Sequence, residues 1–299
     1  MKFISIAFAL LLLFSEPVSP QKNDLSFIIK PGAQLEKLAG DFAFTEGPAA
    51  DLEGNVYFTD QPNDRIMIWS TTGELSTFMQ PSGRSNGMFF DTHGNLWSCA
   101  DEKNELWLIG SDKHVEVILD KYNGTLLNGP NDLWIAPDGS VFFTDPYYKR
   151  PWWNHTNIPQ EKQCVYYLSS DHKNLKRVAE DMVQPNGIIG TPDGKILYVA
   201  DIGGNKTWSF SINKDGSLGN KKLFCEMGSD GMTIDRKGNI YLTGKGETIF
   251  DKTGKQLGNI SVPENWTANV CFGDKDRKSL FITASKGLYR IRTNMKGAY

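Results

Sequence analysis

The sequence has little excess charge of either sign. Its 32 Lys and Arg residues stand against 35 Asp and Glu residues, for a net charge of −3, and no basic run interrupts this balance. Nucleic acids and anionic membrane surfaces attract proteins through clustered positive charge. We therefore expect no nucleic acid and, for the mature form, no membrane among the partners of this protein.

Long hydrophobic runs are also lacking. The longest apolar-leaning stretch covers residues 3–14, directly after Met1-Lys2. It is shorter than the roughly 20 residues that cross a bilayer, but it suits the core of a signal peptide. We predict a signal peptide over residues 1–20, with a cleavage position left open between Ser15 and Lys22. The protein is then exported, to a periplasm or to the medium; a buried N-terminal helix is the alternative.

Cysteine and histidine do not form a metal motif. The four cysteines contain no C-x-x-C pair, and the four histidines share no ligand spacing. Export would permit disulfides, yet three of the four cysteines lie in apolar strand patterns, which favours unpaired buried thiols. The sequence Gly83-Arg84-Ser85-Asn86-Gly87 matches a nucleophile elbow. An elbow needs a helix after it, and here a strand pattern follows, so a serine hydrolase is not indicated.

One pattern, in contrast, occurs six times. Each copy has an opening polar residue, a short apolar run, a tight turn and a second apolar run. A glycine stands eight residues after the opening residue in five copies, and Arg277 takes this place in the sixth. Spacings of 39 to 55 residues with about four strand-like runs per copy are typical of propeller blades. The opening residues are Glu46, Asn86, Asn131, Asn186, Asp230 and Asn269.

These repeats predict an all-β protein, a six-bladed β-propeller that occupies residues 30–295 as a single domain. The last copy has only one strand-like run, residues 288–291, after its second strand. We expect residues 34–38, near the other end of the chain, to supply the missing fourth strand. Closing the ring in this way would remove exposed sheet edges.

The geometry of a propeller brings the opening residues together. All first strands begin at one face, so these six residues should ring the central channel there, with Asp60, Asp145 and Asp201 nearby. Carboxylate and amide oxygens without His or Cys suit Ca²⁺, Mg²⁺ or Mn²⁺ better than Zn²⁺. The alternative is that each residue only binds backbone as a turn former. Glu46 argues against this alternative, because Glu is a poor turn former.

The third copy carries an insertion, residues 146–163, directly after its second strand. This position predicts that the insertion lies on the same face as the opening residues. Its aromatic residues, Tyr147 among them, would offer flat walls that suit sugar rings. A surface loop that packs only on itself is the alternative.

At these residues the chain resembles the SMP-30/gluconolactonase family of six-bladed propellers. The resemblance covers nearly everything after the signal peptide. It implies that Glu46, Asn186 and Asp230 hold a divalent cation, usually Ca²⁺, with Mg²⁺, Mn²⁺ or Zn²⁺ as the other options. It also implies that Asp230 is the general base and that Asn131 completes the metal sphere or contacts substrate. The matching motifs are Glu46-Gly47-Pro48, Asn128-Gly129-Pro130-Asn131-Asp132, Thr144-Asp145-Pro146, Pro185-Asn186-Gly187 and Ser229-Asp230-Gly231-Met232.

The function implied is a metal-dependent lactonase that opens an aldonolactone such as gluconolactone. The cation would polarise the carbonyl, and Asp230, or Asp145 in its place, would activate water. Asn128, Asn131, Asp145 and Tyr147 are the candidate substrate-binding residues. Another esterase or phosphotriesterase on the same site, and a non-catalytic propeller that binds a sugar or a protein, are the alternatives. The oligomeric state is left open.

Overall fold

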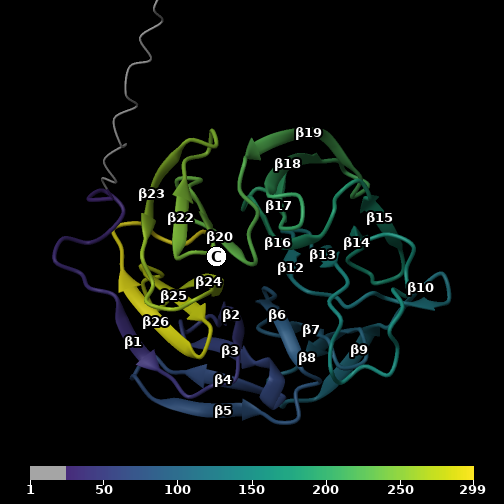
Figure 1. Cartoon of the computed structure of the whole chain (residues 1–299), viewed down its shortest axis with the longest axis horizontal. Helices are drawn as coiled ribbons and strands as arrows, with labels where there is room; N and C mark the ends of the chain where they lie inside the picture. The colour runs from purple at the N-terminus through teal and green to yellow at the C-terminus, as the bar shows by residue number, and fades with distance from the viewer. Residues whose placement is uncertain (1–24) are drawn as a thin grey trace, which may run out of the picture.

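The computed structural model describes residues 25–299 of the chain, so the predicted signal peptide over residues 1–20 lies outside the described residues. Six four-stranded antiparallel sheets surround a central channel (Figure 1). The predicted all-β, six-bladed propeller is therefore confirmed. Within the described part of the chain no helix is long and apolar enough to cross a membrane.

The first five blades are simple up-and-down sheets whose strands follow in chain order from the channel outward, and in the sixth the outermost strand is the N-terminal one. The first blade contains β2 (Thr45–Ala50), β3 (Val56–Asp60), β4 (Arg65–Trp69) and β5 (Leu75–Met79), with the 3-10 helix η1 (Gln61–Asn63) between β3 and β4. The second contains β6 (Ser85–Phe90), β7 (Leu96–Ala100), β8 (Glu105–Ile109) and β9 (Val115–Leu119). The third contains β12 (Leu133–Ile135), β13 (Val141–Asp145), β14 (Cys164–Leu168) and β15 (Leu175–Ala179).

The remaining blades also have four strands each. The fourth contains β16 (Pro185–Gly190), β17 (Ile196–Asp201), β18 (Lys206–Ile212) and β19 (Leu218–Cys225). The fifth contains β20 (Met232–Ile234), β21 (Ile240–Leu242), β22 (Glu247–Phe250) and β23 (Gln256–Ile260). The sixth contains β24 (Thr267–Gly273), β25 (Ser279–Ala284), β26 (Gly287–Arg292) and β1 (Glu36–Ala39). A small hairpin, β10 (Lys121–Tyr122) and β11 (Thr125–Leu126), lies outside the blades.

The repeated turn between the first two strands explains the repeated glycine. Gly54 and its four counterparts all have positive φ, from +68° to +93°, where a side chain is strained. Arg277, the exception in the sixth copy, adopts the same conformation with φ +56°. The turn geometry is thus kept even where its usual residue is missing.

The ring closes as the sequence predicted. The N-terminal strand β1 pairs antiparallel with β26, with Glu36 opposite Arg290 and Lys37 opposite Tyr289, slightly later in the chain than the expected residues 34–38. An ion pair joins Glu36 to Arg290 across this contact at 2.8 Å. The purple and yellow ends of the chain therefore lie side by side in Figure 1.

Apolar side chains fill the spaces between neighbouring blades. Phe58 of the first blade packs with Phe281 and Leu288 of the sixth, and all three are fully buried. All four cysteines of the chain are unpaired; Cys99, Cys164 and Cys225 are buried and Cys271 is half-buried. This outcome agrees with the unpaired thiols expected from the strand patterns. Full burial of a phenylalanine side chain such as Phe58 stabilises the fold by roughly 1.5–3 kcal/mol.

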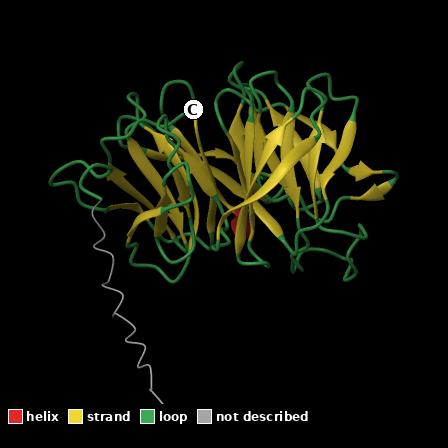
Figure 2. Ribbon diagram, turned by 90° about the horizontal axis from the view of Figure 1, so that it is seen from above, coloured by secondary structure: helices red, strands yellow, loops and turns green. Residues whose placement is uncertain are grey.

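The two mouths of the channel are different. The first strands begin at the mouth that carries Glu46 and end at the opposite one, where the C-terminal residues lie (Figure 2). There Asp235 bridges to Gly297, and the Tyr299 hydroxyl donates a hydrogen bond to the Gly190 carbonyl at 2.7 Å. Each mouth therefore presents its own set of side chains.

Candidate active site

Four of the six opening residues meet at one mouth of the channel in a cavity of about 260 Å³. Glu46, Asn86, Asn131 and Asp230 all line it, from four different blades. Asn186 lies behind them, bonded to Asp230, and Asn269 lines a different cavity. The repeat predicted that all six would ring the channel here, which four of them do. The cavity wall is completed by Phe44, Gln61, Tyr148, Arg150, Ile202 and Trp266.

Glu46 is held at the cavity by an irregularity at the start of β2. The β2–β3 register shifts between Glu46 and Ala49, and such a bulge redirects a side chain from the regular strand pattern. Gly47 has φ +48°, and a Cβ on it would lie 1.9 Å from the Asn86 carbonyl oxygen of the next blade. Only glycine fits there. Its amide donates to Glu46 Oε2 at 2.7 Å and fixes the carboxylate.

Asp230 lies just before β20 and is only partly covered. Its Oδ1 accepts a hydrogen bond from Asn186 Nδ2 at 2.8 Å, and its Oδ2 accepts one from Trp266 Nε1 at 2.6 Å. Asn186 Nδ2 also donates to the Tyr148 hydroxyl at 2.8 Å. The three residues thus hold the Asp230 carboxylate in one orientation from three different segments of the chain.

Glu46 and Asp230 line the same cavity, and their negative charges repel each other. Burial, and then the facing Asp230 carboxylate, raise the pKa of Glu46 well above its usual range. Burial raises the pKa of Asp230, against the opposing effect of the Trp266 and Asn186 hydrogen bonds. A bound cation would relieve this repulsion.

The remaining donors fit a cation that prefers oxygen. Asn86 Oδ1 and Asn186 Oδ1 are buried without a hydrogen-bond partner, which is costly for amide oxygens. Asn131 is 5% exposed and lines the cavity, while its backbone bonds to Thr144 and Gly87. Among residues 25–299 no cluster of three or more His, Cys, Asp or Glu is placed to hold a metal. The donor set is instead two carboxylates with amide oxygens, as Ca²⁺ accepts.

Two predicted substrate-binding residues are structural in the fold. Asp145 is fully buried, and its carboxylate accepts the Asn128 and Gly129 amides, both at 2.9 Å. Asn128 is also fully buried; its Nδ2 donates to the Lys162 carbonyl at 2.9 Å and its Oδ1 accepts the Gln160 amide at 2.8 Å. Neither side chain lines the cavity. This correction also removes Asp145 as an alternative base.

The other aspartates at the ends of second strands also accept hydrogen bonds from backbone amides. Asp60 accepts the amides of Ala43 and Phe44, and Asp201 accepts those of Val183 and Gln184. In each case the carboxylate secures the loop that enters the blade. These residues were expected near the site because their strands end at that face, but their side chains turn into the loops.

The insertion reaches the cavity through the neighbours of the predicted residue. Tyr147 turns away: its hydroxyl donates to the Thr156 carbonyl at 2.8 Å, and its ring packs against Trp153 at a centroid distance of 5.8 Å. Tyr148 and Arg150 line the cavity instead. The correction is a shift of one residue along the insertion, from Tyr147 to Tyr148. Both interpretations of the insertion hold in part, since it packs on itself and also forms a cavity wall.

Arg150 is the only basic residue among those that line this cavity. Its Nε lies 2.6 Å from Asp101 Oδ2, and its guanidinium carbon lies 5.2 Å from the centre of the Tyr148 ring and 5.6 Å from that of Trp152. Burial raises the pKa of Asp101 to about 6, with Arg150 opposing the shift. Asp101 also accepts a hydrogen bond from Gln61 Nε2 at 3.1 Å. The guanidinium is therefore anchored at its Nε side.

Several cavity residues were missed by the sequence reasoning. Gln61 and Ile202 directly follow second strands, so the rule that placed the insertion on this face could have found them. Trp266 precedes β24 by one residue and belongs to the loop that enters the sixth blade. Asp101 and Arg150 meet only through the fold, and no local signal marks their contact.

The fold and this cavity together define a six-bladed propeller with an oxygen-rich site at one mouth of its channel. The model of the SMP-30/Gluconolactonase/LRE-like region matches residues 44–286, and the chain belongs to this family.

Two relatives and one solved structure show how far the similarity extends. A gluconolactonase of Zymomonas mobilis is 30% identical over 91% of this chain and 85% of its own length. A gluconolactonase structure from Xanthomonas campestris has a TM-score of 0.83 and 28% identity, covering 90% of this chain and 92% of its own. The diisopropyl-fluorophosphatase of Loligo vulgaris is 26% identical over 83% of this chain and 87% of its own length.

Proposed function

We propose that this protein is a lactone hydrolase that opens an aldonolactone such as gluconolactone. The observation that carries the proposal is the convergence of Glu46 and Asp230, from separate blades, on one cavity with amide oxygens around it. The gluconolactonase relatives support the same reaction. A site that only binds a neutral sugar has no need of two facing carboxylates.

We propose further that Glu46, Asn131, Asn186 and Asp230 hold a divalent cation, with Ca²⁺ favoured by the all-oxygen donor set. A cation held by these residues would supply Lewis-acid polarisation of the lactone carbonyl. Asn186 would present its Oδ1, which lacks a hydrogen-bond partner in the structure.

Asp230 is the residue proposed to take the proton of the attacking water. Its carboxylate is partly open to the cavity, and the Trp266 and Asn186 hydrogen bonds hold it in place. A carboxylate beside a cation is a weak base. A lactone ring is a reactive ester, so its hydrolysis needs only a weak base. Asp230 can therefore serve in this role.

Arg150 and Tyr148 are proposed to position the substrate. Arg150 is anchored to Asp101 through Nε, and no described residue accepts a hydrogen bond from its Nη atoms. Those donors suit the hydroxyls of a sugar ring or the carboxylate of the opened product. Phe44 and Ile202 give the cavity its apolar walls.

The test compares single-charge removals at the site with a matched removal elsewhere. Glu46→Gln and Asp230→Asn each remove one negative charge, which should lower cation affinity on the order of a hundredfold or more. Asn131→Ala removes a neutral amide, so affinity should fall less while turnover falls more. Asp251→Asn, in the outer turn between β22 and β23, is the control and should change neither quantity. Calorimetry with Ca²⁺ and pH-indicator turnover of glucono-1,5-lactone give the two readouts.

Two outcomes would refute this scheme. Full turnover in excess chelator, with the protein shown to be metal-free, would remove the cation from the reaction. Equal Ca²⁺ affinity in all variants would show that the opening residues only form turns. A panel of sugar lactones, simple esters and organophosphates then separates the alternatives. Organophosphates are included because of the similarity to diisopropyl-fluorophosphatase. If no compound of the panel is hydrolysed, a non-catalytic binding propeller is favoured.

We also propose that the protein is exported, because residues 1–20 have the charge and length pattern of a signal peptide. Expression of the full chain followed by N-terminal sequencing of the exported form is the measurement. A new N-terminus between Ser15 and Lys22 supports export. An intact Met1 in a soluble cell fraction contradicts it.

A further inference from the structure

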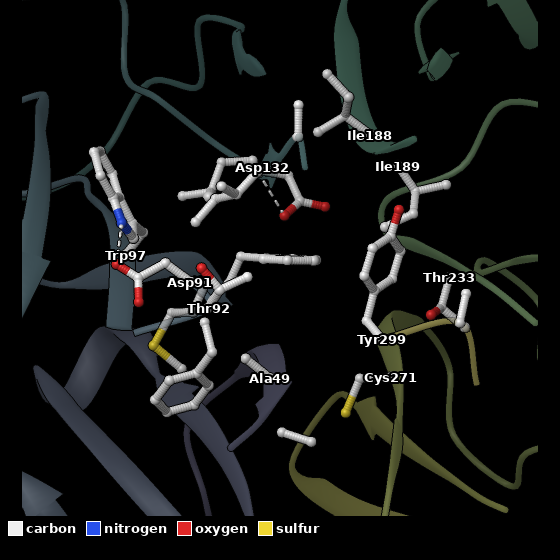
Figure 3. Close-up of a pocket in the computed structure, with 18 of the residues that line it drawn as sticks. Ala49, Asp91, Thr92, Trp97, Asp132, Ile188, Ile189, Thr233, Cys271 and Tyr299 are labelled. Carbon is white, nitrogen blue, oxygen red and sulfur yellow. Dashed lines mark hydrogen bonds between the residues drawn. The ribbon is translucent and has the colours of Figure 1, made fainter. Parts of the chain in front are cut away.

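A larger cavity lies at the opposite mouth of the channel. Its volume is about 680 Å³, within the range of pockets that hold drug-sized molecules. Figure 3 shows side chains from several blades around it, with Ile188 and Ile189 of β16 on one side and Trp97 of β7 on another. Tyr299, from the C-terminal segment, stands at its edge. The walls are thus mostly apolar and aromatic.

This second cavity is separate from the lactone site. The two cavities share no lining residue. Between them the blades approach closely: a Cβ on Gly87 would lie 2.4 Å from Asp132 Oδ1, and one on Gly231 would lie 2.1 Å from the Asn269 side chain. Asp132 and Asn269 line the larger cavity at this partition. A ligand of one mouth therefore does not occupy the other.

Asp132 is a buried acidic group whose hydrogen-bond partners, Leu133, Ile188 and Asn269, are all uncharged. It is 6% exposed, and Figure 3 shows its carboxylate directed into the cavity. One oxygen accepts the Leu133 amide at 2.9 Å, and the other accepts a long hydrogen bond of 3.4 Å from Asn269 Nδ2. No Lys, Arg or His among residues 25–299 forms an ion pair with it. A buried carboxylate is stabilised by a cation or a strong donor.

Carboxyl groups outnumber Arg and Lys side chains among the residues that line this cavity. Asp91 and Asp138 also line the cavity, and the one Arg or Lys that does so, Arg277, donates to the Asp51 carbonyl. Three carboxyl groups against one guanidinium give the mouth a negative balance. A concave apolar surface with this balance attracts cations and repels anions.

We propose that this mouth is a second binding site, for a small organic amine whose apolar body fills the walls and whose ammonium group binds Asp132. The site is independent of lactone hydrolysis. It selects its ligand by charge, since the matching alcohol would lose the ionic contact and the matching acid would be repelled. The apolar walls alone would bind all three compounds alike.

Calorimetric titration with tryptamine, tryptophol and indole-3-acetate tests this selection, because the three probes differ mainly in the charge of the polar end. Tryptamine should bind about tenfold or more tightly than tryptophol, and indole-3-acetate weakest of the three. Asp132→Asn should reduce the affinity for tryptamine to that for tryptophol. Thr92→Trp, in the exposed turn at the rim, should weaken the binding of tryptamine and of tryptophol by narrowing the entrance.

Controls distinguish this site from the lactone site. Asp251→Asn, in the outer turn between β22 and β23, should bind tryptamine like the wild type. Saturating gluconate should not displace tryptamine. No binding of tryptamine at millimolar concentrations, equal affinity for the three probes, or displacement by gluconate would each overturn the proposal. None of these results depends on whether the protein hydrolyses lactones.

Discussion

Glu247 offers a sharp test of how this propeller tolerates a buried acid. It is the first residue of β22, its side chain is fully buried, and neither carboxyl oxygen has a hydrogen-bond partner. Burial raises its pKa well above the usual range, with no neighbouring charge to oppose the shift. Replacement by methionine keeps the length of the side chain and removes its polar atoms. Glu247→Met should therefore stabilise the fold.

The size and the pH dependence of the effect follow from the same burial. An unpaired buried polar group costs about 1–3 kcal/mol, so Glu247→Met should raise the free energy of unfolding by about that amount. The pKa of Glu247 is higher in the folded than in the unfolded chain. Above a pH of about 4.3 the unfolded chain loses the Glu247 proton while the folded chain keeps it. Wild-type stability should then fall with rising pH, by up to ~1.4 kcal/mol per unit, until the folded pKa is passed.

Urea unfolding followed by tryptophan fluorescence, at several pH values between about 5 and 8, measures both quantities. Glu247→Gln separates them, because it keeps a polar group but cannot ionise, so this part of the pH slope should vanish. Glu226→Gln, at an exposed position, is the control and should match the wild type. If Glu247→Met were less stable than the wild type, with the pH slope unchanged, the carboxyl would be satisfied in solution and the reasoning would be wrong.

Three further changes probe other contacts. Trp266→Phe removes the hydrogen bond to Asp230 Oδ2, and should lower kcat about tenfold with little change in KM for glucono-1,5-lactone; a change in KM alone would contradict the role of Asp230. Asp101 should lose its charge, and its hold on Arg150, as pH falls through about 6. KM should then rise in the wild type but not in Asp101→Asn, as pH–rate profiles will show. Leu288→Ala empties a fully buried position between the first and sixth blades and should cost about 2–5 kcal/mol in chemical unfolding; a smaller loss would mean that the blades relax into the gap.

The repeat made the fold predictable because its signals are local. A turn that needs positive φ selects glycine, and strands select β-branched and aromatic residues. The first two strands of each blade can therefore be recognised from the sequence. Even the exception, Arg277, keeps the left-handed turn. The closing strand could be inferred because a four-stranded blade was one strand short.

The candidate site was predictable only where the repeat itself placed the residues. Glu46, Asn131 and Asp230 reach the cavity because they open first strands. Tyr147 was chosen over Tyr148 because nothing in a proline-rich loop tells which side chain turns inward. Arg150 depends on Asp101, which lies in another blade, and such a contact between distant segments leaves no trace in either segment alone.

The pairing of β1 with β26 sets an order of events for the growing chain. A polypeptide made from its N-terminus displays β1 early, yet the partner of this strand is the last strand of the ring, more than 240 residues later. Until β26 has been made, the sixth blade is incomplete and the first blade has no neighbour on one side. A ribosome-bound intermediate would therefore be an open arc, in which the polar residues of the channel are not yet brought together. The cavity lined by Glu46 and Asp230 is then among the last features to form.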